Sequence, residues 1–345
     1  MNSILDLKIN DLNGHESFFE ICVGDILKTE PDEVIDLLCI SAFPDNYLPT
    51  FGTLIKGLGD KGVSVDIEAS NKAYDWRSNW QCWISHPLTK NSLPIERMLC
   101  FEHGELTDAA TVVGNIFRSI REFILQSPKQ PLKLIRLPLL STGNQGFNKI
   151  VMLEEIMRQI FLHLKAGLPV HKVQLVLYSN EPNINKILIS AGIFAEKNKS
   201  EWVSINLAET PKFDYFVSYR RNDSRFVDKV LNAIKLKHTS TKFFIDGKSI
   251  DDGFYWKPQL IKGLYESRKV LCFITDTYAN SIECIDEFHA ALCCSQYRDN
   301  FMKPLLCIPS RDLTTLPRSI QRVQLIDAVM PPRSLSDLVD QICSN

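Results

Sequence analysis

The chain has 345 residues, which is too long for one small module and predicts about two domains. Its composition, 45% hydrophobic and 23% charged residues, is typical of a folded globular protein and excludes a chain that is disordered throughout. The 39 Lys and Arg residues nearly balance the 41 Asp and Glu residues. The chain therefore has no large excess of either charge that would predict binding to nucleic acid or to a membrane surface.

The sequence also lacks targeting and metal-binding signals. No apolar run reaches the roughly 18 residues of a membrane-spanning helix, and residues 1–6 lack the basic start and apolar stretch of a signal peptide. The ten cysteines have no spacing typical of a zinc site, so we expect them to be reduced. These observations predict a cytoplasmic protein that binds neither membranes nor a metal.

Apolar runs of strand length alternate with helical patterns along the whole chain. The predicted strands are Val34–Ser41, Met98–Phe101, Leu132–Leu139, Val173–Ser179, Phe213–Tyr219, Lys242–Asp246, Val270–Thr275 and Pro304–Ile308. Apolar stripes with the helical period predict helices over Ala109–Leu125 and Ile150–Leu164. This alternation predicts two α/β domains with buried parallel sheets. A charged stretch with a proline, over 196–212, places the predicted boundary near residue 208, giving domains 1–208 and 209–345.

A glycine-rich loop follows the strand predicted over Leu132–Leu139 and precedes a predicted helix. Its glycines let backbone N–H groups approach an anion, and the N-terminus of the next helix favours negative charge. The loop therefore predicts phosphate binding, although a glycine-rich turn also serves as a plain connector. Its candidate ligand-binding residues are Ser141, Thr142, Gly143, Asn144, Gly146 and Phe147.

Two earlier turns contribute to the same pattern. They contain Asp25 and Ile26 in the first turn, and Gly52 and Thr53 in the second. Together with the loop at 141–147, they resemble a macro domain, the fold that binds ADP-ribose and its derivatives, over residues 18–180. The resemblance implies a three-layer α/β/α domain that binds an ADP-ribose-type nucleotide.

Roles within this domain follow from the same resemblance. It implies that Asp25 recognises the adenine with Ile26 beside it, that the two glycine loops hold the diphosphate and the distal ribose, and that Phe147 lies near the sugar. Hydrolytic macro domains usually carry an asparagine pair and a run of glycines, whereas this chain has Ser-Ala-Phe-Pro at 41–44 and a single Gly52. We therefore expect nucleotide binding without removal of ADP-ribose from proteins.

The second domain places polar groups where strands end. Ser218 and Arg220 follow an apolar strand, and ligand sites in open parallel sheets lie at the carboxyl ends of strands. On a later predicted helix, Ser281, Cys284 and Glu287 are each three residues apart and share one stripe. A carboxylate held there is suited to stabilising the positive charge that develops when an N-glycosidic bond breaks. Spacing alone favours a solvated helix glutamate.

These segments, with the loop from Asp246 to Trp256, resemble a TIR (Toll/interleukin-1 receptor) domain over about 135 residues. The resemblance implies a flavodoxin-like parallel sheet. In the enzymatic branch of that family, the glutamate that matches Glu287 contacts the nicotinamide ribose of NAD while nicotinamide leaves. The residues that the resemblance places in the NAD cleft, or in the loop over it, are Ser218, Arg220, Asp246, Lys248, Trp256, Ser281 and Cys284.

The combined prediction is an NAD glycohydrolase of the antiphage, immune type that releases nicotinamide and gives ADP-ribose or its cyclic form. Its macro-like domain is expected to bind an ADP-ribose-type nucleotide and regulate the TIR domain, which is expected to self-assemble. One departure is Glu283, where many relatives have tryptophan. Two alternatives stay open: a TIR adaptor that signals by contact without turnover, and a macro-like domain that holds the TIR product as feedback.

Overall fold

The computed structural model describes residues 1–11, 14–30, 33–88, 93–104, 108–126, 132–143, 145–181, 183–203, 211–245, 263–295, 298–330 and 334–344. The chain separates into two compact units, Met1–Ser204 and Ile205–Asn345. The predicted join near residue 208 falls within 204–210, outside the described residues. Among the described helices, none is long and apolar enough to cross a membrane.

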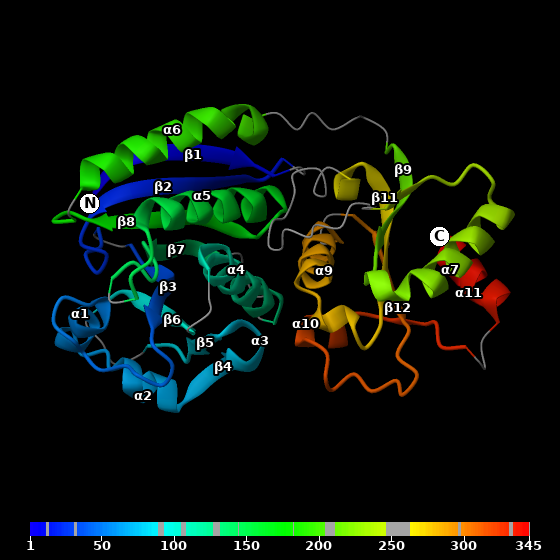
Figure 1. Ribbon diagram of the computed structural model, residues 1–345, viewed down its shortest axis with the longest axis horizontal. Coiled ribbons are helices and arrows are strands. Elements are labelled where there is room, and N and C mark those ends of the chain that lie inside the picture. The colour runs from blue at the N-terminus through cyan, green and yellow to red at the C-terminus, as the bar shows by residue number, and fades with distance from the viewer. Residues whose placement is uncertain are drawn as a thin grey trace. The chain divides into compact units, whose positions relative to one another are not determined.

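The N-terminal unit is built on an eight-stranded sheet with the order β1-β2-β8-β7-β3-β6-β5-β4 (Figure 1). Its strands are β1 (Asn2–Asn10), β2 (Glu16–Gly24), β3 (Ile35–Ala42), β4 (Lys72–Trp76), β5 (Cys82–Ser85), β6 (Ile95–Glu102), β7 (Leu132–Pro138) and β8 (Val170–Tyr178). The five central strands, from β2 to β6 in this order, are parallel. The outer strands β1, β5 and β4 are antiparallel to their neighbours, so the predicted parallel pairing forms the centre of the sheet and antiparallel strands extend it on both sides.

Helices cover both faces of this sheet. They are α1 (Leu54–Asp60), α2 (Val65–Ser70), α3 (Arg77–Trp80), α4 (Ala109–Gln126), α5 (Lys149–Lys165) and α6 (Ile184–Val203). Helices α4, α5 and α6 lie in a row over one face (Figure 1). Buried residues of α1 and α2, including Leu58 and Val65, share an apolar core with β3 and β6 on the other face. The predicted three-layer α/β/α arrangement is confirmed.

The C-terminal unit contains a five-stranded sheet in which every pair of neighbouring strands is parallel, with the order β10-β9-β11-β12-β13. The strands are β9 (Phe213–Ser218), β10 (Phe243–Ile245), β11 (Ser267–Ile274), β12 (Met302–Leu306) and β13 (Ile326–Asp327). The helices are α7 (Ser224–Lys237), α9 (Ile282–Ser295), α10 (Arg318–Gln321) and α11 (Leu335–Cys343). Buried apolar residues of α7 and α11 pack on one face of the sheet. Helix α9 lies on the opposite face (Figure 1), and the predicted parallel α/β architecture is confirmed.

Apolar periodicity located the buried elements well. Each of the eight predicted strands is present with its ends within three residues of the prediction. The predicted helices Ala109–Leu125 and Ile150–Leu164 correspond to α4 and α5. The edge strands β1 and β4 of the N-terminal sheet were not predicted, because they are only partly buried and lack continuous apolar runs.

Candidate functional site

The N-terminal unit has a cleft where the loops after its parallel strands meet. Its first lobe is a cavity of about 620 Å³ bounded by the loop after β2, by α1 and by the ends of β7 and β8. Asp25 and Ile26 line one side, and Tyr178, at the end of β8, lines the same lobe. This volume lies within the range of small-molecule sites. The cleft therefore has room for a ligand at the edge of the sheet where such sites occur.

A second lobe of about 310 Å³ lies beside the first. The segment Gly52–Leu54 and the end of β7 line both lobes, so the two lobes are adjacent parts of the cleft. Hydroxyl, amide and apolar side chains line the second lobe, among them Ser41, Phe43 and Asn46. Among its described lining residues, none carries a charge. This lobe is therefore suited to a neutral part of a ligand with hydrogen-bonding groups.

The described residues of the loop at 141–147 form a turn, of which Ser141, Gly143 and Gln145 line the second lobe. Ser141 has a left-handed backbone with φ +57°, which is uncommon for a residue other than glycine. Its N–H donates to Ser41 Oγ at 3.2 Å, and its carbonyl accepts from the N–H of Phe147 at 3.1 Å. Ser141 is only 2% exposed, and its Oγ has no hydrogen-bond partner among the described residues. A buried hydroxyl in a cavity wall with no protein partner points to a ligand or a bound water.

Most of the residues predicted for nucleotide binding reach this cleft. Those that line one lobe or both are Asp25, Ile26, Gly52, Thr53, Ser141, Thr142 and Gly143. Gly146 and Phe147 line neither lobe. Gly146, with φ +76°, closes the turn, while the Phe147 ring meets the edge of the His103 ring with a centroid distance of 5.2 Å. Asn144 lies outside the described residues.

A buried arginine, which the sequence analysis did not single out, supports the first lobe. Arg136 of β7 has no solvent exposure, and its guanidinium donates to the carbonyls of Ile26 and Lys28 at 3.2 and 3.3 Å. It also donates to Glu33 at 2.6 Å and to Gln174 at 2.7 Å. Arg136 therefore fixes the turn that carries Asp25. In the sequence, its only signal is a single charge within an apolar strand.

The candidate site of the C-terminal unit begins at the carboxyl end of β9. Ser218 is fully buried, lies opposite Cys272 of β11, and its Oγ is 2.7 Å from the hydroxyl oxygen of Tyr278. Tyr278 belongs to the short turn after β11 and is also fully buried. This hydrogen bond ties together the ends of two neighbouring strands beneath the site.

Helix α9 supplies Cys284 and Glu287 of the predicted stripe, and Ser281 lies immediately before the helix. The Ser281 Oγ accepts from the N–H of Cys284 at 3.4 Å and donates to Glu283 Oε2 at 2.8 Å. Cys284 is 4% exposed and Glu287 is 9% exposed. Glu287 is thus a nearly buried carboxylate, and not the solvated helix glutamate that spacing alone favoured.

The charge of Glu287 affects the pKa of groups on several surrounding elements. Burial raises the pKa of Tyr219, Cys272, Tyr278 and Cys284, and the negative charge of Glu287 raises each of them further. Tyr219 follows β9 and Cys272 belongs to β11. Tyr278 belongs to the turn after β11, and Cys284 lies on α9. The Glu287 carboxylate therefore lies among the carboxyl ends of the two central strands. Such a position, partly shielded from water, strengthens its attraction for a developing positive charge.

Arg220 also approaches this cluster. It is half-buried, and its positive charge opposes the rise in the pKa of Cys284 that burial and Glu287 cause. The structure thus brings Ser218, Arg220, Ser281, Cys284 and Glu287 to one end of the unit. Three further predicted residues, Asp246, Lys248 and Trp256, lie outside the described residues.

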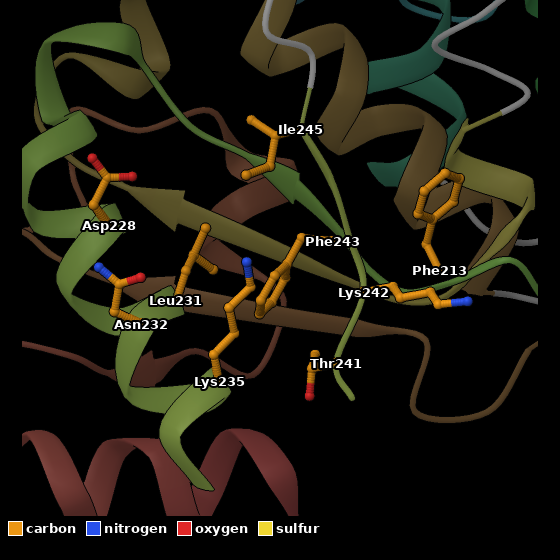
Figure 2. A pocket seen from close by; sticks show the side chains of 9 residues that line it. All are labelled: Phe213, Asp228, Leu231, Asn232, Lys235, Thr241, Lys242, Phe243 and Ile245. Carbon is orange, nitrogen blue, oxygen red and sulfur yellow. The ribbon is translucent and has the colours of Figure 1, made fainter. Parts of the chain in front are cut away.

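The C-terminal unit has another cavity, of about 450 Å³, between α7 and the edge strand β10 (Figure 2). Lys235 of α7 lies over the ring of Phe243 with its Nζ 5.7 Å from the ring centroid. None of the predicted site residues that the structure describes lines this cavity. We therefore do not assign it to the candidate site.

Comparisons with known proteins distinguish the two units. Residues 216–342 match the family model of the TIR domain, which confirms the resemblance inferred for this part of the sequence. No curated protein matches the chain. The C-terminal unit carries a TIR domain that begins within β9 and ends within α11.

Solved structures give more distant similarities. The chain is 17% identical to an Oceanobacillus iheyensis macrodomain with ADP, with a TM-score of 0.42, covering 57% of this chain and 98% of that one. It is 15% identical to a Trypanosoma brucei macrodomain in complex with ADP-ribose, with a TM-score of 0.34, covering 50% and 67%. It is 13% identical to a TIR-STING receptor from C. gigas in complex with 2′,3′-cGAMP, with a TM-score of 0.30, covering 41% and 43%.

Proposed function

We propose that the TIR domain at residues 216–342 cleaves NAD and releases nicotinamide, with Glu287 as the catalytic carboxylate. The observation that carries this proposal is the position of Glu287, 9% exposed among groups at the carboxyl ends of β9 and β11. A carboxylate in such a place stabilises positive charge on a bound ligand. NAD develops such a charge on its ribose as the glycosidic bond breaks.

The reaction divides into bond breaking and capture. When the bond between ribose C1′ and the nicotinamide nitrogen breaks, the electron pair leaves with neutral nicotinamide and the ribose becomes an oxocarbenium cation. Glu287 stabilises this cation more than it stabilises the ground state, which is the requirement for catalysis. Arg220, half-buried near Cys284, is placed to hold a phosphate of the substrate. Water captures the cation to give ADP-ribose, and an intramolecular nitrogen of the adenine gives the cyclic form.

The N-terminal cleft, in this proposal, binds an ADP-ribose-type nucleotide that regulates the TIR domain. Its two lobes, about 620 and 310 Å³, accommodate the two ends of an elongated nucleotide with the diphosphate between them. Gly52–Leu54 and residues 141–143 line the cleft, and the Ser141 hydroxyl, which has no hydrogen-bond partner among the described residues, is placed to donate to a phosphate. Both units would then recognise the same class of molecule.

Regulation of this kind suits an enzyme that consumes a central cofactor in antiphage defence. We propose that the TIR domains assemble before they act, and that nucleotide binding to the N-terminal unit sets the balance between inactive and active forms. Assembly keeps turnover low in the absence of a trigger. A nucleotide changes this balance only by binding one form more tightly than the other.

The catalytic assignment is tested by comparing nicotinamide release from NAD by the wild type and by Glu287→Gln. We expect the variant to be slower by about 100-fold or more, because it loses the negative charge that stabilises the cation. Glu266→Gln is a matched control: Glu266 is also nearly buried, but it precedes β11 and pairs with Lys212. Equal rates for wild type and Glu287→Gln would refute the assignment. Assembly without turnover under every condition would instead favour the non-catalytic adaptor.

The nucleotide-binding assignment is tested by calorimetric titration with ADP-ribose. Gly143→Glu adds a carboxylate to the second lobe, where the new Cβ meets no atom within 4 Å, and we expect ADP-ribose affinity to fall by roughly tenfold or more through repulsion of the diphosphate. Gly192→Glu adds the same charge on α6, also in open space, and lines neither lobe. Equal loss in both variants would contradict binding in the cleft. The effect of ADP-ribose on nicotinamide release then separates activation from feedback inhibition.

A further inference from the structure

Glu283 lies one helical turn before Glu287 on α9. The two residues are four apart on α9, so their side chains are neighbours on the surface of the helix, with Cβ atoms about 6 Å apart. Glu283 is exposed, whereas Glu287 is nearly buried. One carboxylate of the pair therefore contacts water, and the other faces the interior end of the site.

The Glu283 side chain is held in place by Ser281, the residue immediately before α9. Ser281 Oγ donates a hydrogen bond to Glu283 Oε2 at 2.8 Å, and Ser281 itself is 5% exposed. The same Oγ accepts from the N–H of Cys284. Because one oxygen of Glu283 is engaged by Ser281, the carboxylate has a defined orientation and its second oxygen stays available.

Cys284 shows that both carboxylates belong to one cluster. After burial, the charges of Glu287 and Glu283 both raise the pKa of the Cys284 thiol, and Arg220 opposes them. The thiol therefore lies within electrostatic range of both glutamates. Two carboxylates in different environments beside one site are common in enzymes that hydrolyse glycosidic bonds, and such a pair allows one carboxylate to stabilise the cation while the other accepts a proton from water.

Building on the proposed NAD cleavage at Glu287, we propose that Glu283 is a second catalytic residue, the general base that directs the reaction to hydrolysis. As nicotinamide leaves C1′ with the bonding electron pair, a water molecule attacks C1′ and the new C–O bond forms. One proton of this water passes to the Glu283 carboxylate and is then released to solvent. The product is linear ADP-ribose, and both carboxylates return to their ionised state.

This role is tested by measuring two reactions of the same cation in one assay. Hydrolysis requires removal of a proton from water, whereas base exchange with added 3-acetylpyridine requires none, because the pyridine nitrogen attacks with its lone pair. For Glu283→Gln we expect hydrolysis to fall by roughly 100-fold and base exchange to stay within about twofold of wild type. Base exchange thus reports folding and substrate binding in the variant itself.

Two further variants complete the test. Glu283→Asp keeps a carboxylate and should recover part of the hydrolysis. Asp340→Asn removes an exposed carboxylate of α11 that pairs with Lys237 of α7, and it should change neither reaction. An equal fall of both reactions in Glu283→Gln, or no fall in either, would overturn the general-base role. If Glu287→Gln retained both reactions, the proposed function itself would fail. If only Glu287→Gln lost both, the proposed function would stand without this role for Glu283.

Discussion

The two candidate sites differ in how they use charge. In the N-terminal cleft, charged side chains such as Lys56 and Lys61 line the first lobe, whereas no described lining residue of the second lobe is charged. The C-terminal site centres on Glu287, a nearly buried carboxylate whose charge raises the pKa of four neighbouring groups. The cleft is therefore suited to recognising a molecule that has a charged part and a neutral part, and the C-terminal site to stabilising a charge that appears during a reaction.

Under the proposed function, the two domains take related ligands but differ in chemistry. A binding site must satisfy the groups of a stable molecule, whereas a catalytic site must favour a transition state. The second lobe carries Ser41, Ala42 and Phe43 at the end of β3, and none of its described lining residues is a carboxylate. The predictions below test whether the cleft depends on its supporting framework and the C-terminal site on its buried polar contacts.

The largest expected effect comes from removing the framework of the cleft. Arg136→Met leaves Glu33, Gln174 and two carbonyls without their buried partner, which should cost about 3 to 5 kcal/mol of unfolding free energy in the N-terminal unit. For a unit of this size, one calorimetric transition should shift down by about 10 °C. Arg77→Met, which removes a partly exposed guanidinium paired with Asp75, should cost only about 1 kcal/mol. Similar shifts in the two variants would contradict a framework role for Arg136.

A smaller effect is expected at the hydrogen bond beneath Glu287. Ser218→Ala leaves the buried Tyr278 hydroxyl without this partner, and Tyr278→Phe does the reverse. Each should lower the unfolding free energy by about 1 to 3 kcal/mol. In chemical denaturation, the double variant should lose about 1 kcal/mol less than the sum of the single losses. Strict additivity would show that the two hydroxyls do not act as a pair.

The smallest effect on stability is expected at Ser141. Ser141→Gly relieves a left-handed backbone but gives the unfolded chain more freedom, so the free energy of unfolding should change by no more than about 0.5 kcal/mol. It also removes the buried hydroxyl that has no hydrogen-bond partner among the described residues. We expect ADP-ribose affinity to fall about fivefold in calorimetry. Unchanged affinity would show that this hydroxyl does not contact the ligand.

The sequence predicted the buried parts of the fold more fully than its edges. Strands β3, β7, β9 and β11 are apolar runs that stand out because both faces of the sheet are covered. The hairpin of β1 and β2 alternates exposed and buried residues instead. Its one clear signal, the Asn-Gly pair at 13–14, is the typical sequence of a hairpin turn, and a search for apolar runs passes over it.

In the candidate sites too, residues close in sequence could be predicted to lie together, whereas contacts between distant segments could not. The spacing of Ser281, Cys284 and Glu287 is a property of one helix, so it could be inferred from the sequence. The place of Tyr278 could not, because it depends on the register that sets Cys272 opposite Ser218. Arg136 was missed for the same reason, since it reaches Ile26 across 110 residues of sequence.

The division between a recognition site and a catalytic site is tested most directly on a single sample of Glu287→Gln. Calorimetry measures its affinity for ADP-ribose, and chromatography measures the nicotinamide it releases from NAD. We predict an ADP-ribose affinity within about twofold of the wild type, together with nicotinamide release reduced by about 100-fold or more. Nicotinamide release at the wild-type rate, or loss of ADP-ribose binding together with turnover, would contradict this division.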